Sequence, residues 1–177
     1  MCIRDRFLFY EILTLATYPL VTHKGNDDAK KGGRLYLLIL LGTSMLLLLP
    51  AIIWTGFLAG TMDFTAGGIL DGKASSGVLL VLMLLFMFGI GKAALMPFHF
   101  WLPAAMVAPT PVSALLHAVA VVKAGVFTVV KVIVYVFGID LLKETGAGDW
   151  LLYAAGFTVV AASLLSLIHI SEPTRPY

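Results

Sequence analysis

The chain has 177 residues, of which 60% are hydrophobic and 12% are charged, and its formal net charge is +2. Soluble domains carry about 25% charged residues, so this composition indicates a membrane protein. The small net charge, without a basic cluster interleaved with aromatic residues, argues against a nucleic-acid partner. The single cysteine, Cys2, excludes an internal disulfide framework and a cysteine-based metal site.

Apolar segments follow one another along the chain, and a membrane-spanning helix needs about 20 such residues. We therefore predict an all-α fold, a polytopic transmembrane helix bundle with about five spans. The loop 23–34 carries more lysine and arginine than any other loop, so the positive-inside rule places it in the cytoplasm. The predicted spans are 7–22, 35–58, 77–102, 112–138 and 150–165.

The first two segments differ in their polar content. The first carries one charge, Glu11, which a rise of 1.5 Å per residue places about 18 Å from the His23 end, near mid-bilayer. The second has no charged residue, and we expect Pro50 to kink this helix rather than end it.

The third segment is apolar apart from Lys92, His99 and small residues. Gly89 and Gly91 precede the lysine and Pro97 follows it, which predicts a discontinuous helix around Gly89–Pro97. Irregular backbone at membrane depth is tolerated only where it is buried in protein or lines a watery cavity. Interrupted helices of this kind mark ion sites in transporters. The alternative is an ordinary proline kink.

The fourth segment holds His117, Lys123 and Lys131. Lys123 lies about 16 Å from the start of its segment, and Lys92 lies about 15 Å from the end of its own. Both are too deep to reach the headgroups easily. Lys131 is only about 10 Å from the end of its segment, where a lysine can extend to the interface instead.

Glu11, Lys92 and Lys123 therefore come from three segments at similar depth. A charged side chain at this depth usually faces the bundle interior or a water-filled path. A Glu–Lys pair has a proton affinity that depends on separation and hydration, and lysine suits this role better than arginine, which stays charged. Histidine passes protons near neutral pH. We predict a proton relay through Glu11, Lys92, His117 and Lys123, with Lys131 and His99 as secondary relay candidates, although His99 between aromatic residues also fits a packing role.

Motifs for other chemistry are missing from the sequence. The run GIGKA lacks the preceding glycine of a phosphate loop and has alanine in place of Ser or Thr. There is no HExxH motif or nucleophile elbow, and the histidines lack metal-ligand spacing. We therefore expect no catalytic site, metal or cofactor. Any enzymatic role would come from membership of a redox-driven proton pump.

Two stretches carry a family resemblance. KAALMPFHFWLPAAMVAPTPVSALLHAVAVVKAGVF resembles the signature of the proton-conducting antiporter family, and FYEILTLATYPLVTH resembles that family's glutamate-bearing helix. The family includes large subunits of Mrp-type cation/proton antiporters and antiporter-like subunits of complex I and of membrane-bound hydrogenases. The resemblance implies that Glu11 and Lys92 form the family's Glu–Lys pair. It also implies that His117 and Lys123 relay protons toward the middle of the subunit.

PFHFWLP and LLHAVAVVKAG resemble Mrp subunits of the D or A type most closely. The resemblance implies a fragment of an ion-translocating membrane subunit that performs cation/proton antiport in a bacterial or archaeal cell membrane. Its expected partners are other membrane subunits of the complex, the lipid bilayer, protons and sodium. One alternative is an antiporter-like proton-pumping subunit of NADH-quinone oxidoreductase (complex I) or of a hydrogenase. Another is a purely structural membrane scaffold.

The two ends differ from the rest of the chain. MCIRDR at the start and SLIHISEPTRPY at the end resemble translated sequencing adapters, and the last apolar run stops in a polar, Pro-containing tail. We therefore expect residues 7–165 to be a partial antiporter transmembrane domain of a longer chain. We expect residues 1–6 and 166–177 to be non-native.

Overall fold

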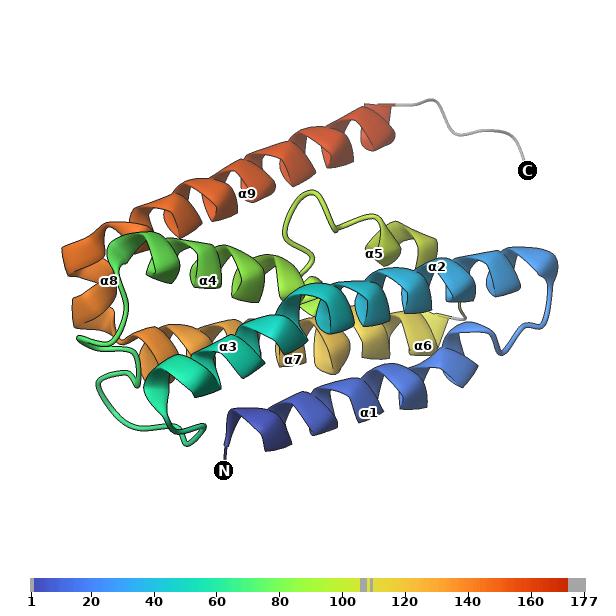
Figure 1. Ribbon diagram of the computed structural model, residues 1–177. Helices are drawn as coiled ribbons and strands as arrows, with labels where there is room; N and C mark the ends of the chain where they lie inside the picture. Colours follow the sequence, from blue (N-terminus) through green and yellow to red (C-terminus); the bar gives the residue numbers. More distant parts are fainter. Residues whose placement is uncertain (1, 106–107, 109, 172–177) are drawn as a thin grey trace.

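The structure is a computed structural model that describes residues 2–105, 108 and 110–171 (Figure 1). The side chains of residues 117–118, 147 and 166–171 lie outside the described part. Within the described residues the regular secondary structure is helical, and one isolated backbone bridge joins Cys2 to Asp63. The predicted all-α class is confirmed.

The first two long helical segments of the bundle, residues 3–21 and 27–59, pack side by side and are joined by a short turn (Figure 1). The second is continuous from Asp27 to Ala59. Pro50 lies in its first α-helical turn after a π-helical segment, and the helix continues through it as predicted. Proline lacks the N–H that an α-helix interior needs, and the wider π turn accommodates that loss. The elements are α1 (Ile3–Val21), α2 (Asp27–Thr43), η1 (Ser44–Leu48) and α3 (Leu49–Ala59).

The third helical segment is broken, as the sequence predicted. Helix α4 (Ser76–Gly89) ends at Gly89 and is followed by a single 3₁₀ turn, η2 (Gly91–Ala93). The chain then takes a non-helical path past Pro97 to the short helix α5 (Trp101–Ala104). Figure 1 shows this irregular stretch in the middle of the molecule, between the ends of α4 and α5.

The remaining helices complete the bundle. The helical segment that contains α7 packs against the broken third segment, and it then bends by 78° into α8. Helix α9 lies over α4 and diverges from the other helical segments toward its C-terminal end (Figure 1). The elements are α6 (Thr110–Ala114), η4 (Leu115–Val119), α7 (Val121–Lys131), η5 (Val132–Phe137), α8 (Ile139–Thr145) and α9 (Ala147–Ser171).

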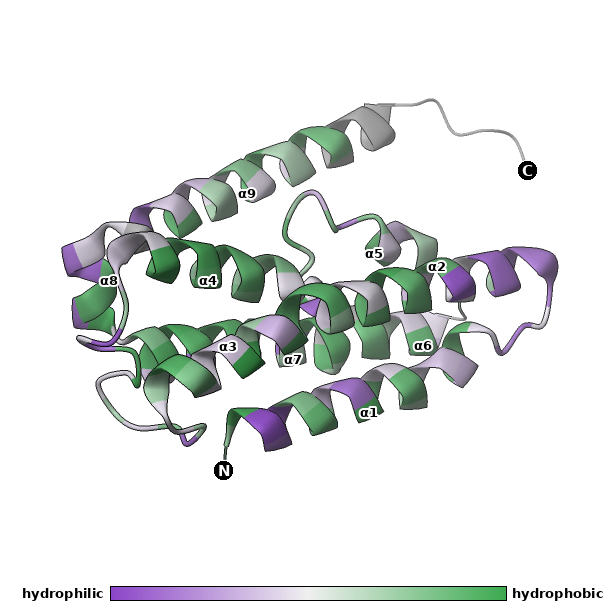
Figure 2. Ribbon diagram, in the orientation of Figure 1, coloured by the Kyte–Doolittle hydropathy of each residue, from purple (hydrophilic) through white to green (hydrophobic). Residues whose placement is uncertain are grey.

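Two described helices are long and apolar enough to cross a membrane, 27–59 and 148–165. The bent pair of α7–η5 and α8 would make a third span. Helix α4 is a shorter apolar helix, and α1 carries charges near its start, where Figure 2 shows hydrophilic residues. Large apolar side chains such as Leu38, Leu46 and Phe57 are exposed on the outside of the bundle. These apolar helices and faces suit a lipid environment.

The buried core has two parts on either side of the helix break. One part joins α1, α3, α4 and η5 and includes Tyr10, Leu48 and Phe86. The other joins α1, α2, α5 and the start of α7 and includes Tyr36 and Trp101. The turn η2 lies between these two parts, and residues 89–92 of the break are buried, whereas Pro97 is exposed.

Candidate functional site

The helix break is held by close backbone contacts on two sides. A Cβ atom on Gly89 would lie 2.5 Å from the backbone nitrogen of Leu48 in η1. A Cβ atom on Gly125 of α7 would lie 2.5 Å from the backbone nitrogen of Ala93. Only glycine allows two backbones to approach this closely. The break therefore fits between α2–η1 and α7 because glycines stand at both contacts.

Helix α5 closes the break from a third side. The Nε1–H of Trp101 donates a hydrogen bond of 3.0 Å to the carbonyl oxygen of Gly91. The indole is fully buried and packs edge-on against the ring of Tyr36 in α2, with 5.7 Å between the ring centroids. The same carbonyl oxygen accepts the backbone N–H of Ala94 at 3.0 Å, so Trp101 adds a second donor to it and ties α5 to η2.

Lys92 is held by α1. It is 0% exposed, and its backbone N–H donates a hydrogen bond of 3.2 Å to the hydroxyl of Tyr10. Its Nζ donates a hydrogen bond to the carbonyl oxygen of Tyr10 and lies 3.3 Å from the centroid of the Tyr10 ring. A lysine ammonium over an aromatic face is attracted by the negative face of the ring. The lysine therefore points into the protein and not toward lipid.

Glu11 follows Tyr10 and is 8% exposed. Both of its carboxylate oxygens are buried, and neither has a hydrogen-bond partner among the described residues. The Nζ of Lys92 contacts the backbone carbonyl of Tyr10, the residue directly before Glu11, and makes no hydrogen bond to the Glu11 carboxylate. A buried carboxylate is stable only when it is paired, hydrogen-bonded or protonated. The structure thus buries an acid on α1 and a base on η2, and the base is bound by the residue that precedes the acid.

Hydroxyl groups extend the buried polar face of α1 beyond Glu11. Thr14 and Thr17 lie four and seven residues after Tyr10, spacings that keep side chains on one face of a helix, and both are buried. Thr17 Oγ1 and the hydroxyl of Tyr36 in α2 are 2.7 Å apart. The polar face therefore runs from Glu11 toward the turn between α1 and α2. Sequence reasoning missed these groups and Tyr10, although the helical spacing of Tyr10, Thr14 and Thr17 could have revealed their shared face.

The other predicted relay residues lie apart from this pair. Lys123 is exposed on α7, and the structure does not bring it to Glu11 or Lys92. His117 lies in η4, and its side chain is outside the described residues. The relay roles predicted for both residues stay predictions.

The secondary candidates contact aromatic rings. Lys131 is half-buried, and its Nζ lies 4.4 Å from the ring centroid of Tyr135. His99 is half-buried with its ring centroid 4.2 Å from that of Phe100, as its predicted packing role requires. Its Nδ1 is buried without a hydrogen-bond partner in the described part of the chain. The same part contains no group of three metal-ligating side chains.

Arg6 is a further polar residue that sequence reasoning did not select. Its guanidinium donates hydrogen bonds to Thr128 Oγ1 (3.3 Å) and to the carbonyl oxygen of Ala124 (3.4 Å). It also lies 4.4 Å from the ring centroid of Phe127. These contacts join the start of α1 to α7. Arg6 falls in the stretch 1–6, which we predicted to be non-native, and that prediction is not tested.

Comparison with known proteins identifies the family. The family model described as NADH:quinone oxidoreductase/Mrp antiporter, TM, matches residues 3–171. The chain is 36% identical over 158 residues to the A/B component of a probable K(+)/H(+) antiporter of Rhizobium meliloti (strain 1021), a match that covers 86% of this chain and 15% of that protein. It is 32% identical over 127 residues to the putative antiporter protein mnhA2 of Staphylococcus aureus (strain JH9), covering 71% of this chain and 16% of that protein.

The chain thus spans about 15% of the length of the first of these relatives. The family match covers nearly all of the described residues and agrees with the apolar helices of the fold. The chain therefore belongs to the NADH:quinone oxidoreductase/Mrp antiporter transmembrane family, and it is an integral membrane protein.

Proposed function

We propose that the chain is part of an ion-translocating subunit that exchanges cations for protons within a multisubunit complex. The observation that carries this proposal is the burial of Glu11 and Lys92 at the helix break, where Lys92 contacts Tyr10, the residue directly before Glu11. Both side chains are buried, they come from different elements, and the carboxylate has no hydrogen-bond partner among the described residues. Buried ionisable residues in membrane helices mark proton and ion pathways.

The pair can carry one proton in two ways. When Lys92 holds the proton, its ammonium stabilises the ionised carboxylate of Glu11 by Coulomb attraction. When Lys92 passes its proton onward, the isolated carboxylate is left buried and binds a proton in its place. The two side chains thus load and release a proton alternately. By the family resemblance, His117 and Lys123 receive protons from Lys92 and lead toward the middle of the subunit.

The contact between η2 and α7 supports this coupling. Gly125 packs against the backbone of Lys92 and Ala93, and Lys123 lies two residues earlier on the same helix. A displacement of η2 is therefore transmitted directly to the helix that bears Lys123. Protons and a cation such as sodium are the proposed substrates, and other membrane subunits are the proposed partners.

A second candidate function is proton pumping in a complex-I-like or hydrogenase complex, because the family model includes NADH:quinone oxidoreductase subunits. The relatives named as antiporter subunits favour antiport. Gene neighbours separate the two. A cluster of small Mrp partner genes supports antiport, whereas genes for subunits with cysteine-ligated iron–sulfur clusters support redox-driven pumping.

The decisive experiment measures cation-induced proton flux in everted vesicles that contain the full-length protein and its partner subunits. Glu11→Gln should lower the flux about 10²-fold or more, because a positioned proton-transfer group contributes that much. Glu144→Gln is the matched control, since Glu144 is exposed in α8. Wild-type flux in Glu11→Gln at equal expression would favour the scaffold alternative.

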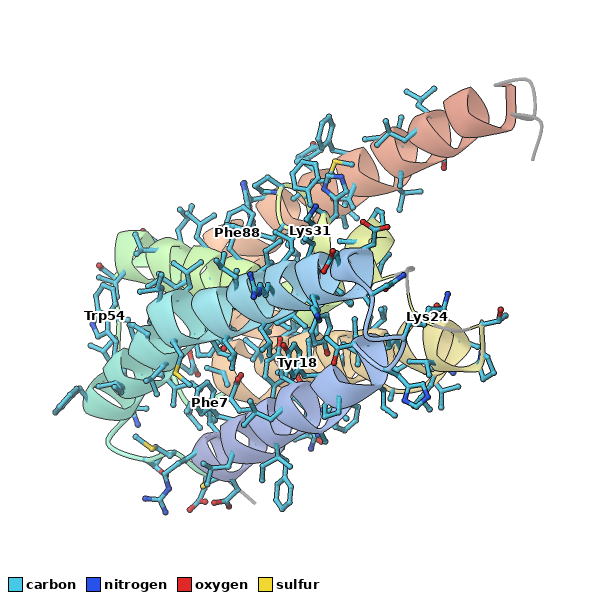
Figure 3. The ribbon with its side chains drawn as sticks, turned by 90° about the vertical axis from the view of Figure 1, so that its right-hand side faces the viewer. Phe7, Tyr18, Lys24, Lys31, Trp54 and Phe88 are labelled. Atoms are coloured by element: carbon cyan, nitrogen blue, oxygen red, sulfur yellow. The ribbon has the colours of Figure 1, made fainter. Side chains whose placement is uncertain are left out.

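The predicted loop 23–34 is in the structure the turn after α1 together with the first two turns of α2, and we also propose that this stretch faces the cytoplasm of a bacterial or archaeal cell. Its basic side chains are exposed, and Figure 3 shows Lys24 and Lys31 near the end of the molecule where α1 passes into α2. A cysteine at position 24 in an otherwise cysteine-free full-length protein should react with a membrane-impermeant maleimide in everted vesicles and remain unlabelled in intact cells. Labelling only in intact cells would reverse the orientation.

A further inference from the structure

We infer that Tyr10 is a positioning residue. Its aromatic face binds the Lys92 ammonium near Glu11, so that the ammonium does not form a direct ion pair with the Glu11 carboxylate. This inference rests on the proposed function of the Glu11–Lys92 pair. Tyr10 is 3% exposed and lies directly before Glu11 on α1. It is the residue through which α1 contacts Lys92.

Each part of Tyr10 takes a different contact with Lys92. The hydroxyl accepts the backbone N–H of Lys92 at 3.2 Å, which anchors η2 on α1. The backbone carbonyl accepts Nζ, and it also accepts the hydroxyl of Thr14 at 3.3 Å. The ring lies beside the same Nζ, 3.3 Å from its centroid. The side chain of Tyr10 thus fixes both the backbone and the charged end of Lys92.

The surroundings of Lys92 leave this role to Tyr10. The charged or titratable residues of α1 around this contact are Arg6, Tyr10 and Glu11, and Tyr10 makes the hydrogen bonds to Lys92. Arg6 carries the same charge as Lys92. Helix α7 meets η2 through Gly125, and α2 contributes Thr43 beside Gly91. Gly125 and Thr43 carry no charge, so the electrostatics of the Tyr10 ring determine how strongly the ammonium at Nζ is stabilised.

This arrangement has a consequence for proton transfer. A direct contact between opposite charges in a low-dielectric interior forms a deep energy minimum. A ring and a neutral carbonyl stabilise the ammonium less strongly. Because Lys92 is held by these neutral groups and not by a direct ion pair, it can pass its proton onward, and the carboxylate of Glu11 then takes up the next proton.

The test varies the electrostatics of the ring at constant shape. In the full-length protein, position 10 is occupied by phenylalanine and then by phenylalanines with one, two and three fluorine atoms. Fluorine weakens the negative face of the ring and leaves its size nearly unchanged. Tyr10→Phe removes the hydrogen bond to the backbone N–H of Lys92, yet we expect it to keep most of the flux because the ring stays beside Nζ. The fluorinated series should then lose flux stepwise, to roughly a tenfold loss at the trifluoro residue.

The same series at position 153 is the matched control, because Tyr153 of α9 is 77% exposed, and it should leave the flux unchanged. Equal flux across the series at position 10, or a complete loss already in Tyr10→Phe, would overturn the role of the ring. If Glu11→Gln and Lys92→Met are inactive while the series is flat, only this inference fails. If both of those variants transport normally, the proposed function itself fails.

Discussion

Lys92 and Lys123 are the same residue type, and they lie at similar distances from the ends of their apolar segments. Lys92 is fully buried in a helix break, whereas Lys123 is exposed on a continuous helical turn. On α7 the buried residues are Val121, Gly125 and Thr128, and residues two apart do not share a helix face. The depth of a lysine in the membrane therefore does not determine which way it faces.

The two lysines also differ in their supports. Lys92 has a hydrogen-bond acceptor and an aromatic ring from α1. Lys123 lies on a face of α7 that has no such support in the described part of the chain. Under the proposed function the two lysines therefore divide the work: Lys92 loads the proton inside this segment, and Lys123 passes it beyond this segment. The following variants test that division.

Lys92→Met should have the largest effect. It removes a buried charge and leaves the carboxylate of Glu11 without its opposite charge, so proton flux in everted vesicles should fall about 10³-fold or more. Lys143→Met is the control, because Lys143 is exposed on α8. Substantial flux in Lys92→Met would show that the buried lysine is not required.

Lys123→Ala should have the next largest effect. An exposed relay group on α7 does not hold the fold together, so the protein should express normally while flux falls about 10²-fold. The measurement is the same vesicle assay, together with the thermal stability of the purified complex. Undiminished flux would remove Lys123 from the relay and leave Lys92 without a partner on α7.

Gly125→Val tests the contact that joins the two lysine-bearing elements. A Cβ here meets the backbone of Ala93, so the substitution should displace η2 and destabilise the protein by about 1–3 kcal/mol. Thermal unfolding and flux should both decline. Gly156→Val in α9 is the control, since a Cβ there meets nothing within 4 Å. Equal stability of the two variants would contradict the close packing of α7 on η2.

Lys131→Met should have the smallest effect. Its ammonium contacts aromatic rings at a half-buried site, where such a contact contributes about 0.5–1 kcal/mol. Flux should stay within about threefold of the wild type. A loss comparable to that of Lys123→Ala would instead place Lys131 in the relay.

Several features of the fold could be predicted because the residues that produce them are local. The glycines and the proline around Lys92 disfavour a regular helix, and the helix breaks there. An isolated Pro50 within a long apolar run kinks or widens a helix, and the helix continues through it. Glu11 could be assigned to the interior because a carboxylate facing lipid is too costly.

Other features depend on tertiary packing that a single sequence does not reveal. The contact between Tyr10 and Lys92 joins residues 82 positions apart, and nothing local to either residue specifies it. The outward direction of Lys123 depends on which face of α7 packs against η2, and Gly125 decides that face. The sequence analysis did not predict the three described π-helical segments. A π-helical turn contains one more residue than an α-helical turn, but its residues are equally apolar, so composition does not distinguish the two.

Trp101 gives the helix break a built-in optical probe. Its indole N–H donates to Gly91 next to Lys92, and the ring is sealed from solvent between α2 and η2. Replacing Trp54 and Trp150 with phenylalanine would leave it as the sole tryptophan of this segment. Its fluorescence would then shift to longer wavelength whenever water reaches the break, so hydration beside the lysine could be followed during turnover in real time.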